Sequence, residues 1–259
     1  MYLRAVHAEL QIPILQQFIR ENPLGILTTA IKSASYPFLQ SSHIPFLLDV
    51  PESAEAQAEA DGAPPNGILR GHMAKQNPQA KALMDAVTET KTYQNESQNQ
   101  DDKSIELPDE VLILFNGPYH HYVTPKFYKE TKPATGKVVP TWNYSAVQAY
   151  GKIRVYCDSK SEETGGFLQK QVEELSQHAE TGIMGSASPW KVADAPENYV
   201  ELLKKNIIGI EVRIERLQGK VKMSQEMKEG DREGVIEGFE GLGTDVGHGI
   251  AQTVRERGK

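Results

Sequence analysis

Cysteine is almost absent from this chain of 259 residues, in which Cys157 is the only one. A single thiol excludes an intramolecular disulfide and a metal cluster held by several thiolates. Chains without paired cysteines are typical of reducing compartments. We therefore expect an intracellular, cytoplasmic protein in which Cys157 packs as a small apolar side chain rather than acting as a nucleophile.

The sequence also lacks a long apolar run and an excess of positive charge. No apolar stretch approaches the length of a membrane-spanning helix, and residues 1–20 lack the apolar core of a secretory signal. The formal net charge of −7 argues against a strong non-specific nucleic-acid binder. Lys204-Lys205 and residues 255–259 are basic clusters of the kind usually found on solvated surfaces. We expect no membrane association and doubt direct DNA binding.

Enough apolar residues are present for a substantial core. Hydrophobic residues make up 39% of the chain and charged residues 24%. Strand-like patterns occupy residues 25–31, 38–49, 68–72, 111–115, 119–124, 138–144, 146–156 and 207–217. Helix-like spacing of apolar residues occupies residues 8–21, 77–88, 162–180 and 195–205. The patterns predict a mainly β (α+β) fold, a closed or nearly closed barrel with appended helices.

The barrel domain is expected to cover residues 1–225, with a helical insertion at about 160–205. Residues 226–259 would form a helical or flexible tail, because eight glycines follow Met227 and favour a short helix with a loosely ordered end. Two polar segments, residues 52–66 and 90–104, are predicted to be exposed inserts of open role.

The segment Leu69–Pro78, which reads LRGHMAKQNP, carries the clearest chemical signal. A strand-like run leads into Lys75 and then into the start of a predicted helix. Backbone N–H groups and a cation at a helix start suit a phosphate. In the alternative interpretation, Asn77 only caps the helix and Lys75 is solvated.

Six segments, in this order, resemble the PaiB-type FMN-binding regulators. They are Gly71–Pro78, Phe115–Pro118, Tyr122–Pro125, Val139–Tyr144, Gly219–Gln225 and Asp231–Gly238. The resemblance runs from Tyr2 to about Gly238, and VPTWNY together with GKVKMSQ is its most specific part. The chain departs from the family pattern in two ways. Glu226 follows Gln225, where the family commonly has Asn, and the two polar inserts are longer than usual.

The resemblance implies an FMN-binding split β-barrel, usually a homodimer with FMN at the subunit interface, and a role in negative transcriptional regulation. It places one block of three residues at the FMN phosphate or ribityl chain, namely His72, Lys75 and Asn77. The full set of expected cofactor-binding residues is Thr28, Thr29, His43, His72, Met73, Lys75, Asn77, Trp142, Asn143, Lys220, Ser224 and Gln225.

Physical reasons support several of these assignments, and each has a plainer alternative. Thr28 and Thr29 can bond flavin oxygens, but threonine is common in strands for its β-propensity. Trp142 can stack on an isoalloxazine ring, or it can belong to an aromatic core or interface. Lys220 suits an anion, unless it is a solvated strand end.

Three functions stay open at this point. The first is a regulator that acts through its flavin, and the second is a flavin-dependent oxidoreductase acting on a small molecule. In the second, His120 or His121 would be the acid or base, and only one can face a given site because neighbouring strand residues point to opposite faces. The third is a haem-binding or haem-degrading split barrel. The seven histidines show no metal-ligand spacing, so we expect no metal.

Overall fold

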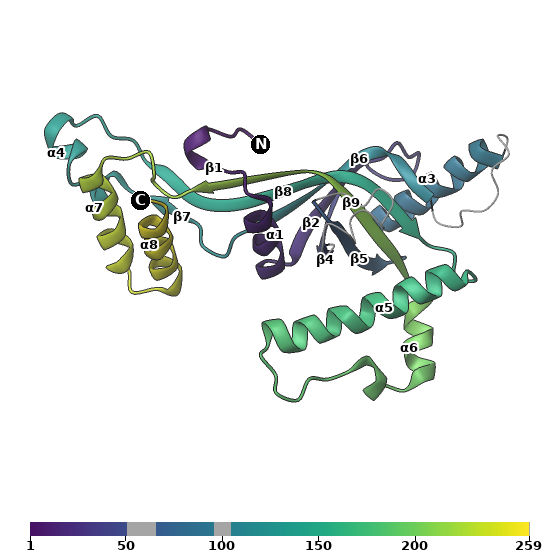
Figure 1. Ribbon diagram of the computed structural model, residues 1–259. Coiled ribbons are helices and arrows are strands. Elements are labelled where there is room, and N and C mark those ends of the chain that lie inside the picture. Colours follow the sequence, from purple (N-terminus) through teal and green to yellow (C-terminus); the bar gives the residue numbers. More distant parts are fainter. Residues whose placement is uncertain (51–65, 96–104, 259) are drawn as a thin grey trace. The chain divides into compact units, whose positions relative to one another are not determined.

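The computed structural model describes residues 1–50, 66–95 and 105–258 (Figure 1). The chain forms two compact units. The barrel unit contains Pro23–Leu114 and Ala149–Arg216. The terminal unit contains Met1–Asn22, Phe115–Gln148 and Leu217–Lys259.

A closed sheet forms the centre of the barrel unit. Its strands follow the order β3-β2-β6-β8-β9-β5-β4. Their bounds are β2 Leu24–Ala30, β3 Leu39–Pro45, β4 Leu47–Asp49, β5 Ile68–Ala74, β6 Ile105–Asn116, β8 Thr141–Tyr156 and β9 Ile207–Lys222. The two ends of this order, β3 and β4, are consecutive in the chain and separated only by Phe46. One continuous segment therefore pairs with β2 on one side and β5 on the other, which closes the barrel.

Every second side chain of a strand points inward, and these side chains fill the barrel interior. In β9, Ile208, Ile210 and Val212 are fully buried, whereas Glu211 and Arg213 on the opposite face are not. This is the pattern of a strand with one face in the core. Where β8 and β9 come closest, a Cβ on Gly151 would lie 1.8 Å from the carbonyl oxygen of Arg213, so only glycine fits.

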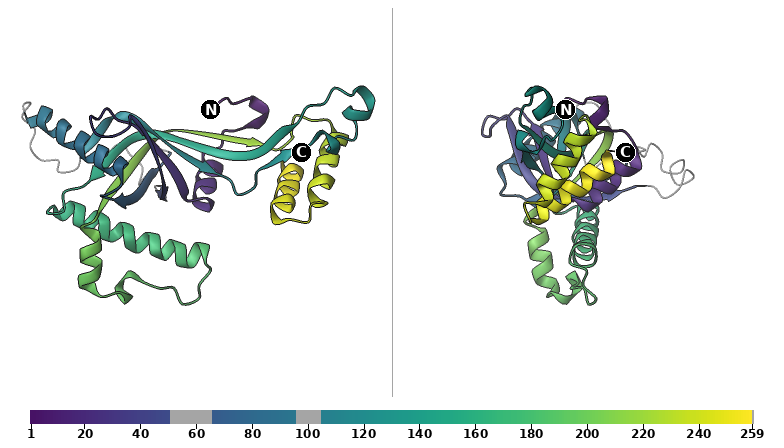
Figure 2. Two further views of the ribbon diagram at one scale, coloured as in Figure 1. Left: turned by 180° about the vertical axis from the view of Figure 1, so that it is seen from behind. Right: turned by 90° about the vertical axis from the view of Figure 1, so that its left-hand side faces the viewer.

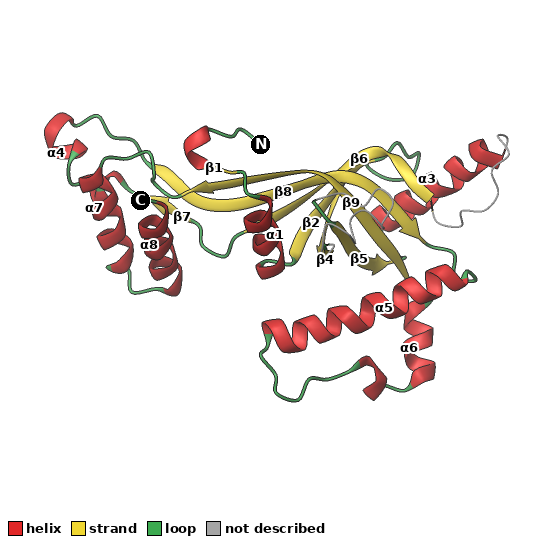
Figure 3. Ribbon diagram, viewed as in Figure 1, coloured by secondary structure: helices red, strands yellow, loops and turns green. Residues whose placement is uncertain are grey.

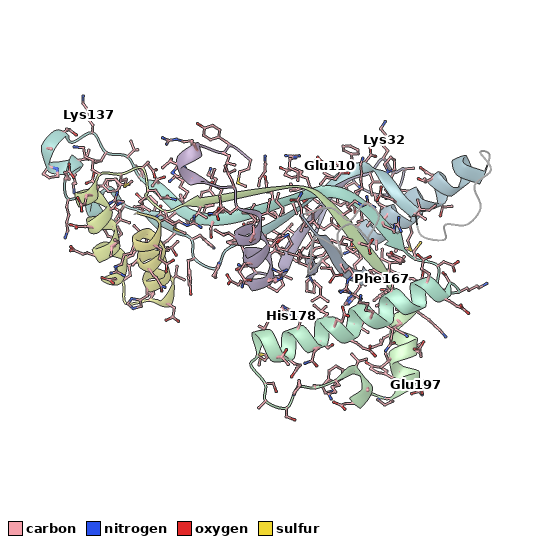
Figure 4. All side chains as sticks on the ribbon, viewed as in Figure 1. Lys32, Glu110, Lys137, Phe167, His178 and Glu197 are labelled. Carbon is pink, nitrogen blue, oxygen red and sulfur yellow. The ribbon has the colours of Figure 1, made fainter. Side chains whose placement is uncertain are left out.

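Three α-helices complete the barrel unit: α3 (Pro78–Asn95), α5 (Glu162–His178) and α6 (Glu197–Lys204). A π-helical turn (Ala179–Ile183) and a 3-10 turn (Val192–Asp194) lie between α5 and α6. Figure 3 shows α5 and α6 together beneath β5. Phe167 on α5 points towards the sheet (Figure 4) and stacks on Tyr156 with ring centres 4.0 Å apart.

Arg70 also fastens α5 to the barrel. Its side chain is nearly buried and binds Asp49, Glu174 and Gln171. The last two residues lie on α5, so one guanidinium joins the strand to the helix.

The terminal unit contains short strands and two packed helices. Its elements are η1 (Ala5–His7), β1 (Ala8–Glu9), α1 (Ile12–Glu21), β7 (His121–Val123), η2 (Pro125–Phe127), α4 (Thr131–Thr135), α7 (Glu229–Glu240) and α8 (Asp245–Arg257). Strand β1 pairs with β9, and β7 pairs with β8. Helices α7 and α8 lie side by side (Figure 2). Phe239 and Ile250 contribute to a core that includes Val221 of β9 and Met223, which follows that strand.

The predicted α+β class with a β-barrel is confirmed, while several predicted bounds were wrong. The first helix begins at Ile12 and not at residue 8, because Ala8 and Glu9 pair with β9. Residues 138–144 and 146–156 were predicted as separate strands, but Thr141–Tyr156 is one strand. The strand predicted to end at residue 217 continues to Lys222.

The C-terminal tail differs most from its prediction. Seven of its glycines lie within or between two well-packed helices, and Gly258 caps the second helix, so the end is not loose. Gly234 and Gly238 allow close packing, because a Cβ at either position would collide with Phe127. The predicted inserts fall mainly outside the described residues, although α3 continues through residues 90–95.

Candidate functional site

Thr28, Ser41 and His43 share the outer face of the β2–β3 hairpin. Thr28 is opposite Ser41 and Ile26 is opposite His43 in the strand register. The hydroxyl oxygens of Thr28 and Ser41 are 2.9 Å apart. His43 is exposed, and the same face carries the half-buried Ile26. The hairpin thus presents two hydroxyls and an imidazole beside an apolar surface.

Thr29 points the other way and has a structural partner. Its side chain is buried and accepts a hydrogen bond of 3.0 Å from Nε2 of Gln79. The same amide donates to the backbone carbonyls of Leu27 and Gln40. Gln79 therefore joins α3 to both strands of the hairpin, and the two neighbouring threonines do not face one site.

Asn77 places the start of α3 beside β3. Its Oδ1 accepts a hydrogen bond of 2.9 Å from the backbone N–H of Gln79, so Asn77 caps the helix as the plainer interpretation predicted. Its Nδ2 donates to the hydroxyl of Ser42 at 2.9 Å. The residues just before the helix are therefore held against the hairpin.

Lys75 supplies a cation at this position. Its backbone N–H donates to the carbonyl of Asn206, and the half-buried residue forms no ion pair within the described part of the chain. We call Thr28, Ser41, His43, Lys75 and Asn77 the β3 site. It offers hydroxyls, an imidazole, an amide and a free ammonium, which is a donor set suited to an anionic ligand.

His72 and Met73 occupy less accessible positions on β5. Met73 is buried inside the barrel. The side chain of His72 points to the opposite side of the strand from Met73. It therefore lies on the same side as Arg70, which is the side that α5 covers. Burial lowers the pKa of His72, and its Nδ1 is a buried atom with no hydrogen-bond partner in the described structure.

A second group of predicted residues lies in the terminal unit, on the open face of β7–β9. Trp142 is 55% exposed, and its ring lies 6.4 Å from that of Tyr122 and 6.5 Å from that of His120. Nζ of Lys222 donates to the carbonyl of Trp142 at 2.8 Å, and burial lowers the pKa of this lysine. We call this group the aromatic face.

Lys220 is part of the same face but is largely buried. Its Nζ donates to the carbonyl of Tyr2 at 3.0 Å and lies 5.3 Å from the centre of the Tyr144 ring. The sequence placed this lysine after the last strand, whereas it belongs to β9 and already has local partners.

Four other predicted residues make contacts within the fold. Asn143 and Ser224 are buried and hydrogen-bond to each other at 3.1 Å. Gln225 folds back onto the backbone of Val221 and Met223. His121 packs its ring edge-on against Phe239. His120 therefore lies near the aromatic face and His121 does not, as expected for adjacent strand residues.

One cleft of the barrel unit differs in character from these sites. It has a volume of about 650 Å³ and lies between the end of β2, α3 and the start of β6. Lys32 and Glu110, labelled in Figure 4, both line it. Glu89 and Asp109 add negative charge, so the rim is acidic and poorly suited to a phosphate. Of the predicted site residues, it contains only Thr29.

Sequence reasoning missed Ser41, which lies beside a predicted residue. Register was the missing signal, because Ser41 pairs with Thr28. Within residues 1–50, 66–95 and 105–258, no helix has the length and apolarity to cross a membrane, and no three potential metal ligands converge.

Comparisons with known proteins agree with the resemblance found in the sequence. The chain is 73% identical over 263 residues to an uncharacterized protein of Aspergillus fumigatus, with 100% of this chain and 98% of that protein covered. It is 30% identical over 135 residues to protease synthase and sporulation protein PAI 2 of Bacillus subtilis, covering 52% and 57% of the two chains.

Among solved structures, one from Bacteroides thetaiotaomicron, described as a "putative 5-nitroimidazole antibiotic resistance protein", has a TM-score of 0.45 and 9% identity, covering 83% and 86% of the two chains. A family model described as "Putative FMN-binding domain" matches residues 1–216. That range contains the whole barrel unit and all residues of the β3 site. The chain therefore belongs to this FMN-binding domain family.

Proposed function

We propose that the protein binds FMN at the β3 site and acts as a flavin-dependent regulator. The observation that carries the proposal is that the hydrogen bond from Asn77 to Ser42 holds the segment of Lys75 against the hairpin whose outer face carries Thr28 and His43. Among the described residues, Lys75 forms no ion pair. All these residues lie within the range matched by the family model.

The donor set fits the parts of FMN. A phosphate dianion needs a cation and hydrogen-bond donors, for which Lys75 and the amide of Asn77 are candidates. An isoalloxazine ring needs a flat apolar surface with a few polar groups at its edge, and Ile26, Thr28 and His43 offer both. When bound, FMN would supply redox chemistry, and the protein would hold and orient it.

A second copy of the chain is part of the proposal. Leu24 and Leu39 flank the site with 56% and 65% of their surface exposed. Exposed apolar side chains next to a ligand site are typical of surfaces that a partner covers. We infer a homodimer in which the partner covers the hairpin and the flavin.

A regulatory role is favoured over catalytic turnover. Residues 24–30 and 39–45 contain no carboxylate, so His43 is the one titratable side chain that the hairpin itself provides. The similar Bacillus protein is named for protease synthesis and sporulation. We propose that flavin occupancy or redox state changes partner binding, in a cytoplasmic setting to which the single cysteine is suited.

The absorption spectrum of protein purified without added cofactor, and then supplied with FMN, tests the proposal. Flavin bands that persist after removal of excess FMN are expected. A Soret band would instead favour the haem alternative, and rapid oxidation of reduced nicotinamide in air would favour an oxidoreductase. Absence of any bound chromophore after FMN is offered would refute flavin binding.

A further inference from the structure

A polar cavity in the terminal unit is independent of both groups of predicted cofactor residues, apart from Gln225 at its wall. It has a volume of about 430 Å³. Seven residues line it: Val6, His7, Ala8, Gln225, Arg232, Arg257 and Gly258. We propose that this cavity binds a small oxyanion of the phosphate or carboxylate class. Three of its four polar side chains are basic types, and none of the lining residues is acidic.

Arg232 has a guanidinium whose donors are largely unused. Its one side-chain hydrogen bond in the described structure is a long contact of 3.4 Å from Nη1 to the carbonyl of Met227. Arg232 is half-buried on α7, and it takes part in no ion pair in the described structure. A half-buried arginine without a carboxylate partner keeps guanidinium donors available to an anion.

The nearby carboxylates are already engaged. Glu9 accepts hydrogen bonds from Nη1 of Arg257 at 2.7 Å and from the backbone of Gln11 at 3.0 Å. These contacts hold the pKa of Glu9 below its usual value despite burial. Glu226 accepts from the buried His7 at 2.9 Å, which lowers the pKa of that carboxyl in the same way. Both acids stay charged and bound, so neither neutralises Arg232.

The chemistry of the guanidinium group favours an oxyanion over a simple halide. A guanidinium donates two parallel hydrogen bonds to a carboxylate or phosphate. Because the cavity lies between residues 6–8 and the helices α7 and α8, a bound anion would join the N-terminal segment to both helices. Binding to the folded state alone should therefore stabilise this unit.

Calorimetric titration with inorganic phosphate and, separately, with succinate tests the proposal at a constant ionic strength set by KCl. The comparison uses Arg232→Gln and the control Arg255→Gln, which removes an exposed arginine of α8 paired with Glu240. We expect binding to the native chain and to Arg255→Gln, and a loss of about tenfold or more in Arg232→Gln.

Phosphate binding alone would identify a phosphate site, and succinate binding alone a carboxylate site. Equal binding to Arg232→Gln, or no heat with either anion, would overturn the proposal. Circular dichroism of the variant checks that it folds. Its affinity for FMN should equal that of the native chain, which separates this cavity from the β3 site.

Discussion

The side-chain amide of Asn77 donates a hydrogen bond of 2.9 Å to the hydroxyl of Ser42. This contact joins two segments that are 35 residues apart and fixes the start of α3 against β3. Lys75 precedes the contact by two residues, and His43 follows Ser42 directly. The bond therefore fixes the segment that carries Lys75 beside the hairpin that carries His43, although Ser42 and His43, as neighbours in a strand, point to opposite faces.

Removal of the Lys75 charge should weaken FMN binding. The Lys75→Gln variant is expected to bind FMN about tenfold less tightly, because a charge-assisted contact with phosphate is lost. Quenching of flavin fluorescence during titration measures the affinity. Lys81→Gln is the matched control, since Lys81 is an exposed lysine in the first turns of α3. Equal losses in both variants would mean that only long-range charge matters.

Arg70 should contribute strongly to stability. Arg70→Ala removes hydrogen bonds to Asp49, Glu174 and Gln171 and loosens α5 from β5. Because the two acids remain about half exposed, we expect a loss of about 2–3 kcal/mol in the free energy of unfolding. Urea denaturation measures it. Arg216→Gln breaks the exposed pair with Glu110 and the contact of the guanidinium with the Tyr150 ring, and should cost about 1 kcal/mol.

Gly151 should tolerate no side chain. In Gly151→Ala the new Cβ would collide with the backbone of Arg213, which cannot move without separating β8 from β9. We expect a loss of about 3 kcal/mol or more in the free energy of unfolding. Gly166→Ala, in the open on α5, is the contrasting variant and should gain about 0.5–1 kcal/mol. A neutral Gly151→Ala would contradict the close strand contact.

Acid should destabilise the barrel unit through His72. Burial lowers the pKa of this imidazole in the folded state, so the unfolded chain takes up its proton first as pH falls. This loss in the free energy of unfolding is absent well above the pKa of about 6.5 that His72 has in the unfolded chain. Below that pKa the loss is at most about 1.4 kcal/mol per pH unit.

A comparison with His72→Gln isolates this contribution. Chemical denaturation at about pH 7.5 and about pH 5.5 should show a larger acid-induced loss of stability in the native chain than in the variant. The lowered pKa values of Glu9, Glu226 and Asp231 act equally in both proteins and cancel in the difference. Equal losses would show that His72 is not shielded from protonation.

Local patterns predicted the strands well and their long-range relations poorly. The alternation of β9 is visible in the sequence, and so is the cap that Asn77 gives to α3. Barrel closure depends on the chain at Phe46, between β3, which pairs with β2, and β4, which pairs with β5. No local sequence pattern indicates that the partner strand changes there. The glycines of α7 appear disordered in a sequence window, yet they permit contact with Phe127, which is distant in the chain.

The residue types of the candidate site could be predicted from the sequence. The face of the sheet to which each side chain points could be predicted less well. Thr28 and Thr29 are equivalent in the sequence, but the pleat sends one to the hairpin surface and the other to Gln79. The resemblance placed the expected cofactor residues in one set, whereas the structure divides them between the barrel unit and the terminal unit. Pairing register decides these directions, and it depends on contacts between distant segments.

The position of the flavin in a crystal structure of the FMN complex tests the central claim most directly. We predict that the phosphate lies within ion-pair distance of Nζ of Lys75 and that the ring lies on the outer face of β2 and β3, near Thr28 and His43. A flavin bound instead on the aromatic face, against Trp142 and Lys222, would contradict the assignment of the β3 site.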